Sequence, residues 1–405
     1  MNLQYLTLFS ILIFFINFLN ILFAFTKSTA NVARWSVIVI LFTAVQIVSW
    51  YAGDFALQWV LIEACTLFGA LLISMSENEK STAVAWKFLL LNSFGMGIAF
   101  LGLIILSFGI HSVVTMDIET IMKNIASEQN SFVEIGIWLA VFGYSVKLGL
   151  VPNQYWVSDT YSESPSQISS LFASMIPVSV SIALRPIIQM DILMQNPHLN
   201  ARHGLLVMGI ATMIYSILTL YQAKDIRRIT SMIALFHNGA IGVFLWLNTS
   251  DEVFYLALTS LVVIKTLIFS SMGILRLDIS SRFLSEISPS EGVSSVSRIL
   301  FLSSVFMAFA LPVSPMFLSD MMALKNAVKH SYYWYTLVPG LGICFFAITL
   351  YKILPVMNIE SRGFRPETRT KITVRAILAG AVFLLAFLLS MFGFYMFAYK
   401  GLGNV

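Results

Sequence analysis

Residues 146–161 read VKLGLVPNQYWVSDTY, and residues 309–324 read FALPVSPMFLSDMMAL. In each stretch a proline inside an apolar run, Pro152 or Pro315, precedes an aromatic residue, an aliphatic residue and a Ser-Asp pair. Proline removes a backbone donor and clashes with the preceding turn, so each helix should be broken there. Free carbonyls at bilayer depth are tolerated only where they line a polar cavity. The two stretches therefore predict a pair of broken helices, a pattern typical of ion paths in transporters.

The composition indicates that the chain lies in lipid. Hydrophobic residues make up 58% and charged residues 11% of the 405 residues, and the mean hydropathy is +0.85, whereas a soluble domain has about 25% charged residues. The net charge of +4 is scattered over loops, which argues against a nucleic-acid partner. Cys65 and Cys344 lie in separate apolar runs without a CxxC or Cys/His cluster. We therefore expect no metal, cofactor or catalytic centre in this chain.

Apolar segments of about 20 residues are long enough to cross a bilayer. The hydropathy pattern predicts an all-α polytopic membrane protein with about twelve transmembrane helices, at residues 5–26, 35–52, 55–75, 83–108, 132–160, 165–190, 204–222, 229–248, 253–275, 298–327, 333–353 and 375–398. The first segment lacks the basic region and the cleavage site of a signal peptide, so we interpret it as a real span.

Loop charges predict the orientation of these helices. Alternate loops contain most of the lysines and arginines, while the other loops contain only Lys123, Arg202, Lys329 and Lys400. By the positive-inside rule the basic loops face the cytoplasm. Both termini should therefore lie outside a bacterial or archaeal cell membrane, with residues 109–131 as the long external loop and residues 354–374 as the main cytoplasmic loop.

The two proline-containing stretches also indicate an internal repeat. Five predicted helices separate the corresponding elements, and this odd offset should invert the second half relative to the first. The predicted units are an N-terminal transmembrane helix at 1–32, a first inverted-repeat half at 33–192, a second half at 203–354, and a cytoplasmic loop with a C-terminal helix at 355–405.

Four ionisable side chains lie within apolar helices: Glu63, Lys147, Lys265 and Asp320. A charge at bilayer depth costs roughly 2.5–3.5 kcal/mol even on lenient insertion scales, so such residues mark candidate ion or proton paths. The Glu63 carboxylate would stabilise the Lys147 ammonium, and separation of the two would favour release of the proton. Lys265 is then the predicted central carrier and Asp320 the terminal acceptor.

Two of these interpretations have alternatives. His237 titrates near neutrality when unperturbed and is a candidate to pass protons between Lys147 and Lys265, but a hydrogen-bonded core histidine explains the same residue. Glu63 and Lys147 would equally well form a purely structural ion pair that holds two helices together.

Three polar residues near helix ends have less specific interpretations. Lys87 follows Trp86 near a helix start and is either a lysine snorkelling to the membrane surface or a modulator of the Glu63–Lys147 pair. Arg185 precedes Pro186 and is interpreted as an anchor at the membrane interface. Asp159 is interpreted as a cap or a loop contact.

Five stretches together resemble one family: LQWVLIEACTLFGALLIS at 57–74, AVAWKFLLLNSFGMGIAFLG at 83–102, VFGYSVKLGLVPNQYWVSDTYSESPSQISSLFAS at 141–174, RRITSMIALFHNGAIG at 227–242 and LPVSPMFLSD at 311–320. In order and spacing they resemble the proton-translocating antiporter-like subunits of complex I, of formate hydrogenlyase and related membrane hydrogenases, and of Mrp sodium/proton antiporters. The nearest resemblance is to the hydrogenase-4 component F type, over about residues 33–325.

The resemblance puts the family's carrier roles on Glu63, Lys147, Lys265 and Asp320. It also implies that this chain lacks the first two helices of the family. The chain departs from the family at Leu258 and Leu261, where relatives commonly have histidines, and at Phe236, where a glutamate usually precedes the histidine. Water would have to bridge the longer gaps between carriers.

Together, the charges and the resemblance predict a subunit that translocates protons, or alternatively sodium ions, within a larger membrane complex. The driving reaction would occur in other membrane and cytoplasmic subunits, such as a redox module. A second possible partner is a soluble zinc-dependent carbonic-anhydrase-like subunit of a bicarbonate or CO2 uptake complex, because subunits of this family also pair with such proteins. The alternative of a different class is a non-conducting structural membrane anchor, which the missing relay groups favour.

Overall fold

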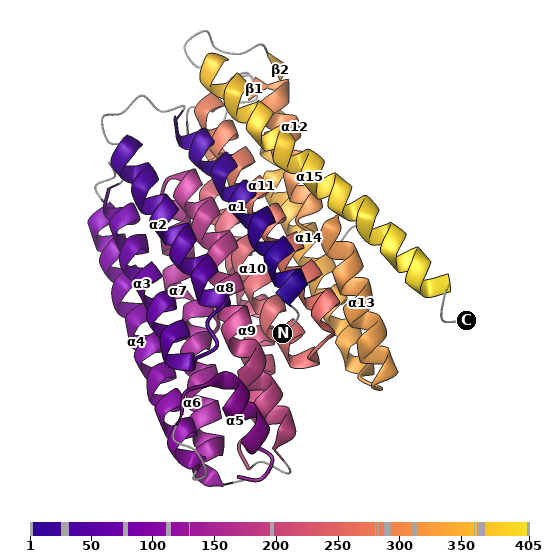
Figure 1. The fold of residues 1–405 in the computed structure, drawn as a ribbon. Coiled ribbons are helices and arrows are strands. Elements are labelled where there is room, and N and C mark those ends of the chain that lie inside the picture. Colours follow the sequence, from indigo (N-terminus) through magenta and orange to yellow (C-terminus); the bar gives the residue numbers. More distant parts are fainter. Residues whose placement is uncertain are drawn as a thin grey trace.

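A computed structural model describes residues 3–25, 32–75, 80–110, 115–128, 130–194, 198–279, 281, 283–286, 293–309, 314–359, 361–362 and 369–402. These residues form a bundle of helices that run roughly along one another (Figure 1). The α-helices are α1 (Leu3–Phe25), α2 (Val32–Trp50), α3 (Phe55–Ser74), α4 (Ser81–Gly109), α5 (Ile118–Asn124), α6 (Ser131–Leu148), α7 (Tyr155–Glu163), α8 (Ser166–Leu193), α9 (Ala201–Gln222), α10 (Ile226–Leu247), α11 (Asp251–Asp278), α12 (Ser295–Met307), α13 (Pro315–Lys329), α14 (Leu337–Met357) and α15 (Arg369–Leu402).

The predicted all-α polytopic fold is confirmed. Within the described residues, nine helices are long and apolar enough to cross a membrane, and three shorter apolar helices lie at Leu6–Leu19, Arg34–Trp50 and Ser295–Met307. The count of twelve spans stays a prediction, because length and composition alone do not decide whether the shorter helices cross.

Both predicted helix breaks are present. The expected span at 132–160 is divided into α6 and α7, with Pro152 in the interruption, and the expected span at 298–327 is divided into α12 and α13, with Pro315 as the first residue of α13. Proline is well tolerated at the first position of a helix because that position has no backbone hydrogen bond to lose. Each break is therefore a place where one helix ends and another begins.

The connections differ from the prediction in three respects. The expected external loop at 109–131 contains the short helix α5. The predicted boundary at 354 falls inside α14, which continues to Met357. Strand β1 (Val293–Ser294) pairs in parallel with β2 (Ser361–Arg362) and ties the α11–α12 connection to the α14–α15 connection. Hydropathy detects none of these, because they depend on caps and on contacts between distant segments.

The two ends of the bundle are distinct. In Figure 1 the β1–β2 pair lies at one end and α5 lies at the other. Helix α2 starts at the β1–β2 end, whereas α9 starts at the α5 end. The five helical tracts from α2 to α8 and the five from α9 to α14 thus begin at opposite ends, as an inverted repeat requires, and the division at 33–192 and 203–354 stays a prediction.

Three helices form the centre of the bundle. In the most apolar 18-residue stretch of α8, α10 and α11, 94%, 94% and 78% of the residues are buried. The surrounding helices expose apolar side chains. Helices α4 and α6 pack closely because glycines face each other. A Cβ at Gly143 would collide with the backbone of Ala99, and one at Gly102 with the backbone of Ala140. Small residues permit this close approach of membrane helices.

Candidate functional site

Glu63 and Lys147 lie next to each other in the first half of the bundle. Lys147 Nζ on α6 is 3.5 Å from Glu63 Oε2 on α3, and the two side chains are 2% and 18% exposed. The Thr66 hydroxyl lies between them, because it donates to Glu63 Oε2 at 2.9 Å and accepts from Lys147 Nζ. Ser93 on α4 donates to the other carboxylate oxygen. The structure therefore brings the two predicted partners together, directly and through Thr66.

The first helix break begins immediately after Lys147 and Leu148. Gly149 ends α6 in the left-handed conformation, with a φ of 77°, which glycine adopts without steric cost. The backbone groups freed by the break are bonded by side chains of other elements. These bonds join Trp156 Nε1 to Val146 O at 2.9 Å, Asn238 Nδ2 to Leu148 O at 2.8 Å, and Val151 N to Thr212 Oγ1 at 2.8 Å.

Lys265 lies in the middle of α11 and is fully buried. Its Nζ donates to Asn238 Oδ1 at 2.5 Å, and Asn238 Nδ2 donates in turn to Leu148 O at 2.8 Å. Leu148 directly follows Lys147 in the chain. A single asparagine on α10 therefore joins Lys265 to the first helix break, one residue from Lys147.

His237, the residue before Asn238, is bonded to the second break. Its Nε2 lies 2.7 Å from the carbonyl oxygen of Ala308, which ends α12. A carbonyl only accepts, so Nε2 bears the hydrogen and Nδ1 of the neutral ring is an acceptor. This buried Nδ1 has no hydrogen-bond partner within the described part of the chain.

The structure gives His237 and its neighbour Asn238 different partners. Asn238 bonds Lys265 and Leu148 O, whereas His237 bonds Ala308 O. The partners differ because adjacent residues of a helix point in directions about 100° apart. The passage of protons by His237 between Lys147 and Lys265 stays a prediction.

Two serines bond the carbonyls around the second break. Ser260 on α11 donates to Pro315 O at 3.0 Å, and Ser314, which caps α13, donates to Met307 O at 2.7 Å. Asp320 lies farther along α13 and is half-buried. It has no hydrogen bond or ion pair with any other residue that the structure describes. The structure therefore does not join Asp320 directly to Lys265 or His237.

Other buried polar atoms flank the lysines. Tyr144 Oη lies nearly one turn before Lys147, and Thr266 Oγ1 directly follows Lys265; neither has a hydrogen-bond partner among the described residues. Buried polar atoms are nearly always bonded to protein or to water. These atoms therefore mark positions suited to water on α6 and α11, the helices that contain Lys147 and Lys265. In the described ranges no three His, Cys, Asp or Glu side chains gather closely enough to hold a metal ion.

Lys87 does not contact the Glu63–Lys147 pair. Its Nζ lies 2.7 Å from Asp159 Oδ2, with the Lys87 side chain 59% exposed, and Arg228 Nη1 lies 3.9 Å from the other oxygen of Asp159. Asp159 thus links α4, α7 and α10 near the β1–β2 end of the bundle. Asp159, which the sequence suggested as a cap or a loop contact, lies within α7 and forms ion pairs instead. The modulating role of Lys87 stays a prediction.

Arg185 is buried and is not an anchor at the lipid surface. Arg185 Nη2 pairs with Asp251 Oδ1 at 2.6 Å and donates to Thr249 O at 2.9 Å. Its guanidinium also lies over the Phe254 ring, 4.1 Å from the centroid. The interpretation from sequence was wrong because the acidic partner lies in another helix, 66 positions away along the chain.

Sequence reasoning missed three residues of the site: Thr66, Ser93 and Asn238. Serine and threonine are common in membrane helices, so their presence alone gave no signal. Asn238 did offer a signal in the sequence, because a buried amide in an apolar helix must find partners for both its oxygen and its nitrogen.

The family described as NADH:quinone oxidoreductase/Mrp antiporter, TM, matches residues 52–349, a range that contains both breaks and all four ionisable side chains. The chain belongs to this family. The resemblance inferred from the motifs is thereby confirmed, and the chain is a multi-pass, antiporter-like membrane subunit of the NADH:quinone oxidoreductase/Mrp antiporter family.

Several known proteins are similar to this antiporter-like chain. The hydrogenase-4 component F homolog of Methylacidiphilum infernorum (isolate V4) is 26% identical over 294 residues, which cover 69% of this chain and 60% of that protein. The chain thus spans about 60% of the length of this curated relative.

Two solved complexes contain a chain of similar fold. A chain of the membrane-bound sulfane sulfur reductase, an archaeal respiratory membrane complex, matches with a TM-score of 0.81 and 16% identity, over 97% of this chain and 80% of that chain. A chain of the Mrp complex from Dietzia sp. DQ12-45-1b matches with a TM-score of 0.74 and 16% identity, over 96% and 81% of the two chains. At this identity the likeness shows the fold alone, and both matched chains belong to multi-subunit complexes.

Proposed function

We propose that this antiporter-like subunit translocates protons across a bacterial or archaeal cell membrane as part of a larger complex, with both chain termini outside. The single observation that carries the proposal is the arrangement around α10. There Asn238 bonds Leu148 O at the first break and Lys265, while the adjacent His237 bonds Ala308 O at the second break. Buried ionisable groups are costly in a membrane, so a transport role accounts for a row of them between two breaks.

The first step takes place at Glu63 and Lys147. Their 3.5 Å contact and the Thr66 bridge favour a protonated Lys147. Weakening that contact favours release of the proton toward Lys265. The Asn238 amide does not itself accept and pass on a proton, so it holds Lys265 in place while water near Tyr144 and Thr266 carries the proton.

The second step takes the proton from Lys265 toward Asp320. The Nδ1 atom of His237, which has no hydrogen-bond partner among the described residues, is the acceptor in this step. Asp320 is the terminal acceptor of the row. Sodium remains the alternative cargo, because carboxylates and hydroxyl oxygens also bind hard cations.

The driving reaction is assigned to a redox module made of other membrane and cytoplasmic subunits. The similarity to a hydrogenase-4 component F homolog and to a chain of an archaeal respiratory membrane complex supports this partner class. No corresponding observation favours a carbonic-anhydrase-like partner. The β1–β2 end of the bundle, with Lys87, Arg228 and Arg276, is the surface at which a cytoplasmic partner would dock.

Substitution of Lys265 tests this function. Inverted membrane vesicles containing the whole complex are supplied in turn with NADH, formate and reduced ferredoxin, and acidification is followed with a pH-sensitive dye. Lys265→Ala should abolish the signal while the complex still assembles, because the change removes a carrier without burying a new charge. The control Lys123→Ala, at an exposed ion pair on α5, should pump normally.

Three outcomes would argue against the proposal. Loss of assembly in Lys265→Ala, or unchanged pumping, would indicate a structural anchor. Uptake of radioactive sodium into the vesicles that survives a protonophore would identify sodium as the cargo.

A further inference from the structure

A cavity of about 530 Å³ opens at the end of the bundle that contains α5. It lies between α1, the turn from α2 to α3, α5, α8 and the start of α11. Alongside apolar side chains its lining contains six polar or charged residues: Gln58, Asp117, Glu119, Arg185, Gln189 and Asp251. We call this cavity the vestibule.

The rim of the vestibule is held by the backbone. Phe55 N donates to Met116 O and Ile118 N donates to Gly53 O, both at 2.9 Å. Hydrogen bonds from the hydroxyl and the backbone N–H of Thr120 hold the pKa of Asp117, which precedes α5, below its ordinary value. Asp117 therefore stays ionised at neutral pH and places a negative charge at the rim, which favours the approach of cations.

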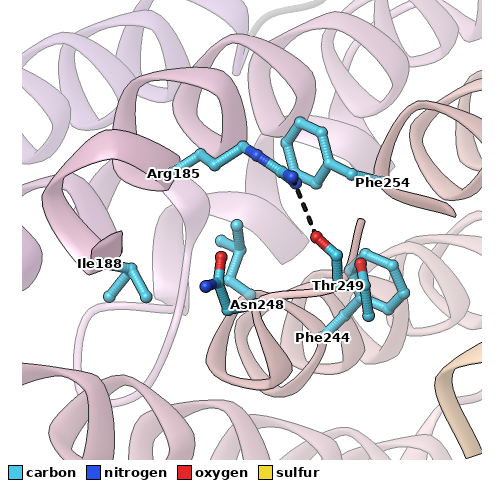
Figure 2. Close-up of a pocket in the computed structure, with 7 residues that line it drawn as sticks. Arg185, Ile188, Phe244, Asn248, Thr249 and Phe254 are labelled. Atoms are coloured by element: carbon cyan, nitrogen blue, oxygen red, sulfur yellow. Dashed lines mark hydrogen bonds between the residues drawn. The ribbon is translucent and has the colours of Figure 1, made fainter. Parts of the chain in front are cut away.

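Arg185 forms one wall of the vestibule. On the vestibule side it pairs with Asp251, and on the other side it borders a small cavity of about 10 Å³ with Asn248, Thr249 and Phe254 (Figure 2). Figure 2 shows the guanidinium bonded to the Thr249 carbonyl. Three contacts fix the arginine, so the passage inward from the vestibule does not lead through this wall.

A column of polar side chains leads inward from the vestibule along α2 and α8. Trp50, which lines the vestibule, donates through Nε1 to Ser179 Oγ at 2.7 Å, and Ser179 donates to Gln46 Oε1. Gln58 and Thr43 are 2% and 3% exposed. Their Oε1 and Oγ1 atoms have no hydrogen-bond partner in the part of the chain that the structure describes. Gln58 is thus a deeply buried, unpaired acceptor in the vestibule wall, and Thr43 lies one turn beyond Gln46.

We propose that external water fills the vestibule and reaches Gln46 and Ser179, and that this column is the external mouth of the ion path. Buried polar atoms without protein partners are the sites that ordered water occupies. Ser179 lies on α8, which packs against α6 with Lys147 and against α11 with Lys265. The part of this inference that concerns the ion path rests on the proposed transport function, whereas the water access does not.

Thiol labelling tests the water access. In a background with Cys65→Ser and Cys344→Ser, three single cysteines are compared: Gln58→Cys, Ser179→Cys and Ser181→Cys. Ser181 is the matched control, because it lies on the same helix, is equally buried and donates to its own helix backbone at Pro177 O, 2.6 Å away. A charged, membrane-impermeant methanethiosulfonate is added to whole cells. Gln58→Cys and Ser179→Cys should react at least about tenfold faster than Ser181→Cys, because only a hydrated thiol ionises readily.

Each outcome decides a different part of the proposal. Labelling of Gln58→Cys without Ser179→Cys would show that the column is dry, and reaction only with a lipid-soluble reagent would show that lipid fills the vestibule. Labelled Ser179→Cys complexes should also lose vesicle acidification while treated Ser181→Cys complexes retain it. Labelling without loss of acidification would remove the column from the ion path. If the unlabelled complex does not pump at all, the proposed function fails, but the labelling still decides the water access.

Discussion

Adjacent residues His237 and Asn238 join the two helix breaks. Asn238 bonds the carbonyl of Leu148, and His237 bonds the carbonyl of Ala308. Lys265 is joined to the first of these bonds, because its ammonium donates to Asn238. An amide satisfies a lysine and a carbonyl at once without adding charge, which explains how a buried lysine is kept in place without a carboxylate beside it.

Two substitutions of Asn238 separate the effect of an added charge from the effect of lost hydrogen bonds. Asn238→Asp places a carboxylate against Lys265, so the lysine should hold its proton more tightly and the pH for half-maximal pumping should move upward. Asn238→Leu leaves two buried polar groups unpaired, at a cost of roughly 1–3 kcal/mol each, and should reduce pumping at every pH. Vesicle acidification measured from pH 6 to pH 9 distinguishes the two; identical profiles would exclude the positioning role of Asn238.

At the scale of elements, the broken helices and the glycine contacts set the geometry. The breaks expose backbone carbonyls in the bundle interior, and side chains from α7, α10 and α11 bond to them. Helices α4 and α6 approach closely because glycines face each other. This close contact positions Ser93 of α4 and Lys147 of α6 around the same Glu63.

Two glycine substitutions test the importance of this packing. Gly143→Ala puts a methyl group against the backbone of Ala99 and should destabilise the protein by about 1–3 kcal/mol, as overpacking does. Gly97→Ala on α4 meets no atom within 4 Å, and alanine favours a helix by roughly 0.5–1 kcal/mol over glycine. The midpoint of thermal aggregation in detergent should fall for Gly143→Ala and should hold or rise for Gly97→Ala. Equal shifts would show that the α4–α6 contact is loose.

At the scale of the whole molecule, the loop charges at the two ends of the bundle predict its orientation in the membrane. Helix α5 lies at one end of the bundle, and the β1–β2 pair lies at the other (Figure 1). The positive-inside rule assigns the β1–β2 end to the cytoplasm, because most loop lysines and arginines belong to it. The vestibule would then open to the outside.

Single cysteines at positions 3 and 403 test this orientation; position 403 lies outside the described residues. In the background without Cys65 and Cys344, an impermeant thiol reagent added to intact cells should label both positions, because an even number of spans returns the chain to the same side. Labelling of either position only after lysis would reverse the orientation or change the number of spans.

The sequence by itself determined the membrane class, the family, the two breaks and the four buried charges. These features are local: hydropathy follows from about 20 consecutive residues, and proline breaks the helix in which it stands. The sequence also predicted the proximity of Glu63 and Lys147, through the resemblance to the family and the attraction of opposite charges.

Only the tertiary structure decided how the candidate carriers are connected. Asn238 and Leu148 are 90 positions apart, and Trp50 and Ser179 are 129 apart. Which face of each helix meets which neighbour depends on packing throughout the bundle, and small residues such as Gly143 set how closely two helices approach. The asparagine link, the second-break partner of His237, the buried pairing of Arg185 and the vestibule all arise at such contacts between helices, where no local pattern in the chain specifies the partner.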